Sequence, residues 1–289
     1  MPLLDLACLL LAALIGFASH RASLCNVKAV AEVLEVRRAW MLASLAVAVL
    51  WSATVAGTLI LALHWPVLAP LRRSPGWLAI AGGYIFGVGA AINGGCSLST
   101  LQRLADGELA MGVTLGGFAL GVLLWTSFES RGVATMLVTT MSPWEAMRTL
   151  SKIVLAGLFL WALQEAVRLW RRARALSWAN RLGAPVYRLS SAAALLGIAG
   201  GLLFALQGSW TYTYVLRTQI ASAFGMAPPM AWSAMLALAL LAGMLASSMQ
   251  RRSFALRLPQ RRQFLGCFVG GTLMGIGGAL LPAATTPCC

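Results

Sequence analysis

Two cysteines in this chain occupy positions where a hydrogen-bonding site for an anion is readily formed. Cys96 follows a break at residues 93–95 in a glycine-rich apolar segment, and a short polar stretch, Ser97–Leu104, follows it. Cys25 follows a polar break after the first apolar segment. A helix that begins at such a break presents unpaired backbone N–H groups and the positive end of its dipole, which favour an anion.

A thiol is a soft group and a weak hydrogen-bond donor, so it suits a soft sulfur anion better than a hard oxyanion such as phosphate. The competing interpretation of Cys25 and Cys96 is a pair of small buried side chains on a glycine packing face. We prefer that structural interpretation for Cys8 and Cys267 only, because neither follows a comparable break.

The predicted substrate-binding residues are the two thiols, the groups beside the second break and two aromatic residues. They are Cys25, Gly94, Gly95, Cys96, Ser97, Ser99, Thr100, Trp210 and Tyr212. Trp210 and Tyr212 follow a later apolar segment much as Cys25 follows the first, and they are equally compatible with aromatic residues at a membrane interface. Arg217 lies in an apolar stretch and is either part of a site or a side chain that snorkels to the surface.

The remaining titratable residues do not form a recognisable catalytic or metal-binding pattern. Six cysteines and two histidines occur without a zinc-ligand spacing, and there is no Ser-His-Asp set, paired carboxylate motif or phosphate-binding loop. The sequence therefore predicts no catalytic residues, no metal, no cofactor and no enzyme activity.

The composition is that of a protein that crosses a membrane several times. Of 289 residues, 60% are hydrophobic and only 10% are charged, and several apolar runs approach the ~20 residues that a helix needs to cross a bilayer. We predict eight membrane spans, at 3–19, 39–63, 77–94, 109–127, 148–170, 190–207, 229–249 and 263–282. The first lacks the basic leader of a cleavable signal peptide, so it is expected to be retained. Segments 23–36 and 209–225 are predicted to form short amphipathic or re-entrant helices, and 131–141 a third short element.

The net charge of +14 is better explained by cytoplasmic loops than by nucleic acid, because no stacking aromatics are interleaved with the basic residues. With the N-terminus outside, 15 of the 22 basic residues lie on the inner side. They are Arg21, Lys28, Arg37, Arg38, Arg103, Arg171, Arg172, Arg174, Arg181, Arg188, Arg251, Arg252, Arg257, Arg261 and Arg262. Arg72 and Arg73 do not fit this orientation, which is otherwise the predicted one.

An internal repeat organises the chain. Residues 6–36 and 192–222 each contain an apolar helix, a polar break and an amphipathic helix, and the glycine pattern of 82–95 returns at 270–282. Five spans precede the second copy, so the copies should be inverted, as in many transporters with interrupted helices. We predict an all-α polytopic fold of two inverted repeats: 1–170 with the first repeat, a basic linker at 171–189, and the second repeat at 190–289. The alternative is that glycine patterns recur in any tightly packed membrane bundle.

The segment GGCSLSTLQRLADG resembles the YeeE/YedE family of sulfur-compound membrane transporters, whose characterised members take up thiosulfate. Gly94, Gly95, Cys96, Thr100 and Leu101 match the family's glycine–cysteine break, with Ser99 where glycine is usual. Cys25 matches a second family cysteine, and the resemblance extends over nearly the whole chain. It implies inverted halves, short helices that meet at the centre, and cysteines that pass thiosulfate along by S–H hydrogen bonds.

The chain departs from the family pattern at its end, where the second repeat is expected to be incomplete. Loss of one G from codons for Pro-Gly-Gly-Asn-Asp-Thr-Leu-Leu yields Pro-Ala-Ala-Thr-Thr-Pro-Cys-Cys, which is the sequence of residues 282–289. We therefore expect a frameshifted, truncated product in which Cys288 and Cys289 have no evolved role and activity is weak. The alternative is a native polar tail.

Together these observations predict a multi-pass protein of the bacterial inner membrane that takes up thiosulfate or a related small sulfur anion. Its expected partners are that anion and the lipid bilayer, without nucleic acid. The alternative is a membrane sulfur-relay protein that carries persulfide sulfur on Cys96 and delivers it to a cytosolic sulfurtransferase. A structural scaffold, in which both cysteines are replaceable, is the third interpretation.

Overall fold

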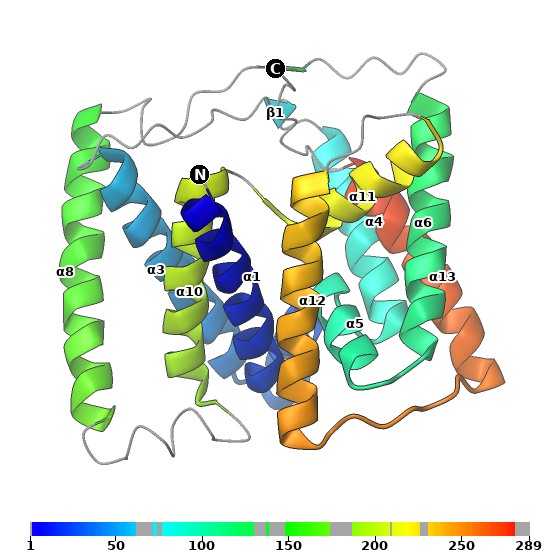
Figure 1. The fold of residues 1–289 in the computed structure, drawn as a ribbon, viewed down its shortest axis with the longest axis horizontal. Helices are drawn as coiled ribbons and strands as arrows, with labels where there is room; N and C mark the ends of the chain where they lie inside the picture. The colour runs from blue at the N-terminus through cyan, green and yellow to red at the C-terminus, as the bar shows by residue number, and fades with distance from the viewer. Residues whose placement is uncertain are drawn as a thin grey trace.

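The protein is a bundle of long helices in the computed structural model, which describes residues 2–61, 72–73, 77–129, 137–138, 148–173, 187–208, 210–225 and 231–280 (Figure 1). Eight helices in this part of the chain are long and apolar enough to cross a membrane, which confirms the predicted spans. They are α1 (Pro2–Ala22), α3 (Trp40–Leu61), α4 (Trp77–Asn93), α6 (Ala110–Glu129), α8 (Arg148–Ala173), α10 (Leu189–Gln207), α12 (Ala231–Arg251) and α13 (Arg261–Leu280).

Short helices stand at three of the connections, close to where the sequence predicts them. They are α2 (Asn26–Ala31) with its π-helical continuation η1 (Glu32–Val36), α5 (Ser97–Ala105) and α11 (Tyr212–Ala223). The predicted element at 131–141 lies outside the described residues except for Leu137–Val138. These two residues form strand β2, which pairs antiparallel with strand β1 (Arg72–Arg73) and adds a minimal sheet to an otherwise helical fold.

The first helix of each predicted repeat packs against the second helix of the other. In Figure 1, α1 and α12 run from the end where the N-terminus lies toward the opposite end, whereas α3 and α10 run the other way. Gly16 of α1 faces the Leu240 carbonyl and Gly243 of α12 faces the Ala13 carbonyl, so the two backbones approach closely. Helices α10 and α3 meet in the same manner, through Gly197 and Gly201 of α10. This reciprocal packing is compatible with two inverted repeats, which remain a prediction.

Helix α13 forms the centre of the other half of the bundle, where it packs between α4 and α6. Gly89 of α4 and Gly270 of α13 face each other's backbone, and Gly271 faces the Thr114 carbonyl of α6. Small residues permit this close approach, and in a membrane such packing replaces the hydrophobic effect as the main source of helix association. The short helix α5 is thereby enclosed between α6 and α12.

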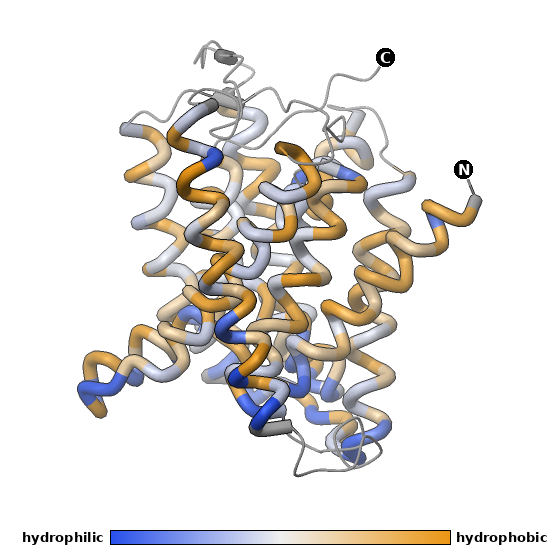
Figure 2. Tube along the Cα trace, turned by 90° about the vertical axis from the view of Figure 1, so that its left-hand side faces the viewer, coloured by the Kyte–Doolittle hydropathy of each residue, from blue (hydrophilic) through white to orange (hydrophobic). Residues whose placement is uncertain are grey.

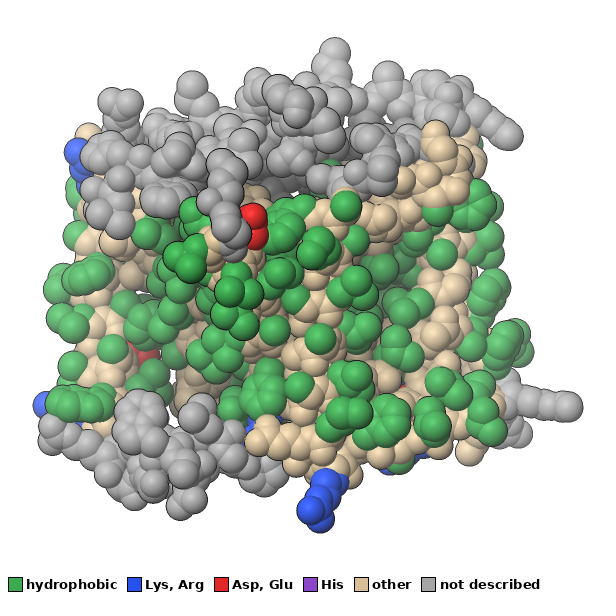
Figure 3. Space-filling model, viewed as in Figure 1, with side chains coloured by type: hydrophobic (Ala, Val, Ile, Leu, Met, Phe, Trp, Pro, Cys, Tyr) green, Lys and Arg blue, Asp and Glu red, His purple; other side chains and the backbone are tan. Residues whose placement is uncertain are grey.

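The outer surface is suited to lipid. Hydrophobic side chains cover the flank of the bundle between its two ends (Figure 3), and Leu160 of α8, Ile80 of α4 and Val49 of α3 are exposed there. Hydrophilic segments gather mostly at the end opposite the N-terminus (Figure 2). The tail at 282–289, with Cys288 and Cys289, lies outside the described residues, so the frameshift remains a prediction.

Candidate functional site

The break between α4 and α5 is built around the side chain of Asn93. Gly94 adopts a left-handed conformation, with φ of 70°, which glycine tolerates without a steric penalty. The Asn93 amide donates to the Gly95 carbonyl oxygen at 3.1 Å and to Thr100 Oγ1 at 3.0 Å. Its own carbonyl oxygen accepts a hydrogen bond from Thr114 Oγ1 at 2.7 Å. Asn93 therefore fixes the path of the chain into α5 and the position of Cys96, the residue that precedes this helix.

Cys25 holds the corresponding position before α2, after a break in which Ser23 has a φ of 50°. The structure brings the two cysteines together: Cys25 Sγ donates to Cys96 Sγ at 3.6 Å. Both residues are buried, with exposed fractions of 1% and 6%. The separation of 71 residues along the sequence shows that this contact is made by the tertiary fold.

Neither cysteine side chain caps the helix that follows it. The hydroxyl groups of Ser99 and Thr100 donate to the Cys96 carbonyl oxygen, at 2.9 and 3.2 Å, and so do not cap the first N–H groups of α5. Because the first N–H groups of any helix lack partners within the helix, the start of α5 retains the capacity to bind an anion beside a thiol.

A cavity of about 10 Å³, close to the least space that holds one water molecule, adjoins this helix start. Its polar lining consists of Ser97, Thr100, Thr114 and Tyr212, and its apolar lining of Leu115, Phe118, Leu216 and Met274. Among the described residues, the buried Tyr212 hydroxyl and the buried Trp210 Nε1 have no hydrogen-bond partner in good geometry. A buried donor without a partner costs about 1–3 kcal/mol, so these groups are suited to accept a ligand that supplies acceptors.

The predicted binding residues have different structural roles. Gly94 and Gly95 form the break, Ser97 and Thr100 line the cavity, and Ser99 bonds the backbone. Trp210 packs with Tyr212 against the cluster that contains Leu101 of α5. Arg217, the remaining candidate on α11, is half-buried and is not among the residues that line the cavity.

The other described cysteines lie elsewhere. Cys8 belongs to a buried cluster between α1, α10 and α12, where the Gln207 amide donates to its sulfur at 3.3 Å. Cys267 packs against Ala110 and Met111, at the start of α6. Neither residue lines the cavity beside Cys96.

A polar network that no sequence motif predicts lies at the other end of α5. Asp106 Oδ1 accepts hydrogen bonds from Ser253 Oγ at 2.6 Å and Ser248 Oγ at 2.8 Å, and it lies 3.1 Å from His20 Nε2. Burial raises the pKa of Asp106, but the bonds from Ser253 and Ser248 and the neighbouring His20 outweigh burial, so its pKa lies below the usual value. The signal in the sequence was a lone histidine at the end of an apolar span, which has no distinctive motif around it.

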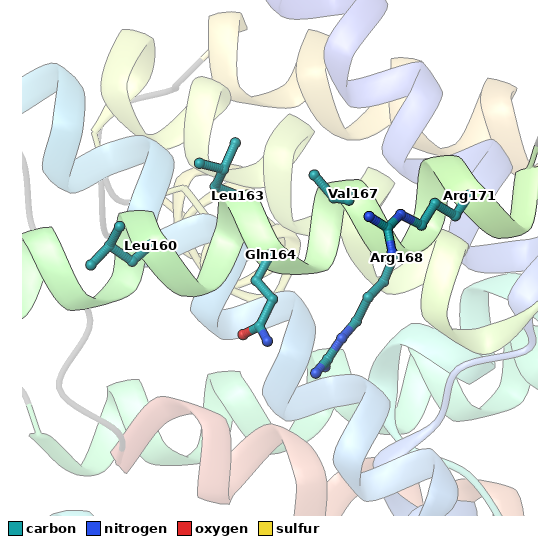
Figure 4. Close-up of a pocket in the computed structure, with 6 residues that line it drawn as sticks. All are labelled: Leu160, Leu163, Gln164, Val167, Arg168 and Arg171. Carbon is teal, nitrogen blue, oxygen red and sulfur yellow. The ribbon is translucent and has the colours of Figure 1, made fainter.

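A groove on the outside of the bundle is unrelated to the thiols. Among the described residues its lining comes from α8, through Leu160, Leu163, Gln164, Val167, Arg168 and Arg171. Figure 4 shows Gln164 and Arg168 extending to the same side of that helix. The Arg168 guanidinium lies 3.5 Å from the Glu165 carboxylate. A long basic side chain at the end of an apolar helix is typical of a membrane interface.

Fold and site together define a multi-pass membrane protein in which two interrupted helices bring a pair of thiols into contact. The family model described as Sulphur transport matches residues 21–281. The match includes both thiols and every predicted binding residue, and the chain belongs to this family, the YeeE/YedE sulphur transport family. A comparison with curated proteins found no similar sequence.

Proposed function

We propose that this protein takes up thiosulfate or a related small sulfur anion, which passes along Cys25 and Cys96 and the start of α5. The observation that carries the proposal is the thiol contact of 3.6 Å at the meeting of two helix starts. Membership in a sulphur transport family supports a sulfur compound as the substrate. The thiols donate weak hydrogen bonds and the helix start contributes N–H groups, so both stabilise a soft anion without covalent chemistry.

Tyr212, which lines the cavity, and Trp210, which packs with it against the Leu101 cluster, supply stronger donors than the thiols. Their unpartnered O–H and N–H groups can bond the oxygens of a sulfur oxyanion while its terminal sulfur contacts a thiol. The apolar wall of the cavity is formed by Leu115, Phe118, Leu216 and Met274. Such a wall strengthens a hydrogen bond made beside it by excluding water. The cavity is small, so the proposal requires these side chains to move when the anion enters.

The sulfur-relay alternative is less well supported by the geometry. Delivery of persulfide sulfur from Cys96 to a cytosolic sulfurtransferase requires the partner's own thiol to reach that sulfur. Cys96 is 6% exposed and Cys25 is 1% exposed, so neither thiol is accessible to another protein in this conformation. Passage of a small anion needs a much smaller opening.

The proposed orientation places the N-terminus outside the inner membrane. Helices α1 and α12 run toward the opposite end (Figure 1), where their last turns carry Arg21 and Arg251. Basic residues favour the cytoplasmic side. Gln260, between α12 and α13, is exposed at that end. Labelling of a cysteine introduced there by an impermeant reagent from outside intact cells would contradict this orientation.

The function is tested by uptake of sulfur-labelled thiosulfate in a strain that lacks its own thiosulfate carriers. We expect accumulation above the empty-vector control, with competition by unlabelled thiosulfate. A parallel strain carries the gene with one G restored near codon 282, so that weak activity from the predicted frameshift is separated from a wrong substrate. Absence of uptake in both strains, at confirmed membrane expression, refutes the proposal.

A further inference from the structure

The two thiol-bearing segments are joined by three contacts that lie in a row along α5. Cys25 meets Cys96 at its start, the Gln102 amide donates to the Ser19 carbonyl oxygen at 3.0 Å, and His20 meets Asp106 at its end. Asp106 is the residue that ends α5. A helix of 9 residues moves as a unit on this scale, so a constraint at Asp106 also constrains Cys96.

Asp106 makes hydrogen bonds to more segments of the chain than Cys96 does at the start of α5. Besides its bonds to Ser248 of α12 and to Ser253, its backbone carbonyl oxygen accepts from the Ala255 N–H at 2.9 Å. The partner histidine is fixed as well, because His20 Nδ1 lies 3.0 Å from Ser247 Oγ. Arg251 donates to the His20 carbonyl oxygen at 3.4 Å. The end of α5 is therefore tied at once to α1 and to α12.

The thiols leave no gap between them in this arrangement. A separation of 3.6 Å between the sulfurs is close to contact for non-bonded heavy atoms, which pack at ~3.5–4.0 Å. If an anion passes between Cys25 and Cys96, as the proposed function holds, the two sulfurs must first move apart. The segment that carries Cys96 is α5, and its movement away from α1 is opposed by the His20–Asp106 contact.

We propose that His20 and Asp106 are positioning residues for transport, a latch that holds α5 against α1 and keeps Cys25 and Cys96 in contact. This inference rests on the proposed function for its biological meaning, but the thiol contact that it concerns is measurable without any substrate. Release of the latch separates the sulfurs and opens the path. Removal of the Asp106 carboxylate should therefore shift the protein toward the separated state.

The test measures how fast Cys25 and Cys96 can be joined as a disulfide in native membranes. The parent variant has alanine at Cys8, Cys267, Cys288 and Cys289. Iodine oxidises the remaining two thiols to one disulfide and is itself reduced to two iodide ions, with release of two protons. After denaturation, a maleimide-polyethylene glycol reagent adds two mass increments to unoxidised protein and none to the disulfide form.

Asp106→Ala should slow disulfide formation by about tenfold, the size expected when hydrogen bonds to a charged group are lost. The matched control is Glu108→Ala in the same turn, because Glu108 pairs with Arg103 at 2.7 Å and with Arg257 at 3.7 Å, neither of which is on α1. The control should stay within about twofold of the parent.

Equal oxidation rates in the parent and Asp106→Ala overturn the latch. If Asp106→Ala does not reach the membrane, His20→Ala gives the same test from the α1 side and leaves Asp106 with its bonds from Ser248 and Ser253. A parent rate from His20→Ala likewise overturns the proposal. Failure of thiosulfate uptake would instead refute the proposed function, and the oxidation rates would still decide the latch.

Discussion

The break between α1 and α2 and the break between α10 and α11 each contain a residue with positive φ, but they carry different side chains. The first passes through Ser23, with φ of 50°, and the second through Gly208, with φ of 75°. In the first, Cys25 precedes the short helix and makes no cap. In the second, Thr211 precedes α11 and its hydroxyl accepts a hydrogen bond from the Tyr214 N–H at 3.4 Å.

This difference indicates two ways of contributing to one site. Threonine is a favoured N-cap and satisfies the start of its own helix, whereas a thiol is a poor cap and leaves the N–H groups to a ligand. The second break instead contributes donors from side chains, the Tyr212 hydroxyl and the Trp210 indole. We infer that the break before α2 supplies a thiol and backbone donors, and that the break before α11 supplies stronger side-chain donors, of which Tyr212 lines the cavity.

The largest loss of uptake should come from replacing the thiols, which only the breaks before α2 and α5 carry. Cys96→Ala should reduce thiosulfate uptake by at least about tenfold, because a lost hydrogen bond to a charged ligand is of that size. Cys25→Ala should act in the same direction. Cys8→Ala is the matched control, since Cys8 lies in a packing cluster, and should retain uptake. Uptake of Cys96→Ala equal to that of the parent, per amount of protein in the membrane, would leave the thiol path without support.

A smaller effect is expected at the second break. Tyr212→Phe should reduce uptake by about threefold, because Ser97 and Thr100 line the same cavity and their hydroxyl groups can replace part of the lost hydrogen bond. The same change should raise the thermal midpoint of the substrate-free protein, since it removes a buried hydroxyl without a partner. Opposite signs for uptake and stability would identify Tyr212 as a ligand group. A loss of both would show that the hydroxyl has a structural role.

The smallest effects concern the caps themselves, measured as thermal midpoints in detergent. Thr211→Ala should destabilise the protein by about 1 kcal/mol through the loss of a cap. Cys96→Ser should stabilise it by about 0.5 kcal/mol, because serine is a good N-cap, and should impair uptake less than Cys96→Ala, because a hydroxyl still donates a hydrogen bond. Destabilisation by Cys96→Ser would show that the start of α5 is already satisfied.

Much of the architecture could be predicted from the sequence because it follows from local composition. Eight apolar runs of membrane length predict eight helices, and the glycine at 94 and the polar residues after it predict where α4 ends and α5 begins. The pattern around Cys25 likewise predicted a short helix after the first span, and the structure begins α2 immediately after that residue. These features depend on residues that are neighbours along the chain.

The tertiary structure alone decided which of these features meet. No spacing in the sequence requires Cys25 to lie 3.6 Å from Cys96. Nor does any spacing require Asp106 to form hydrogen bonds with Ser248, Ser253 and His20. Those contacts join helices that are distant in sequence, and they depend on how glycine faces such as Gly16 and Gly243 let α1 and α12 approach. Hydrophobic periodicity and turn signals fix single elements, whereas the choice of packing partner depends on the shape of whole helix surfaces. For that reason the thiols were predictable as candidates, and their contact and the network behind it were not.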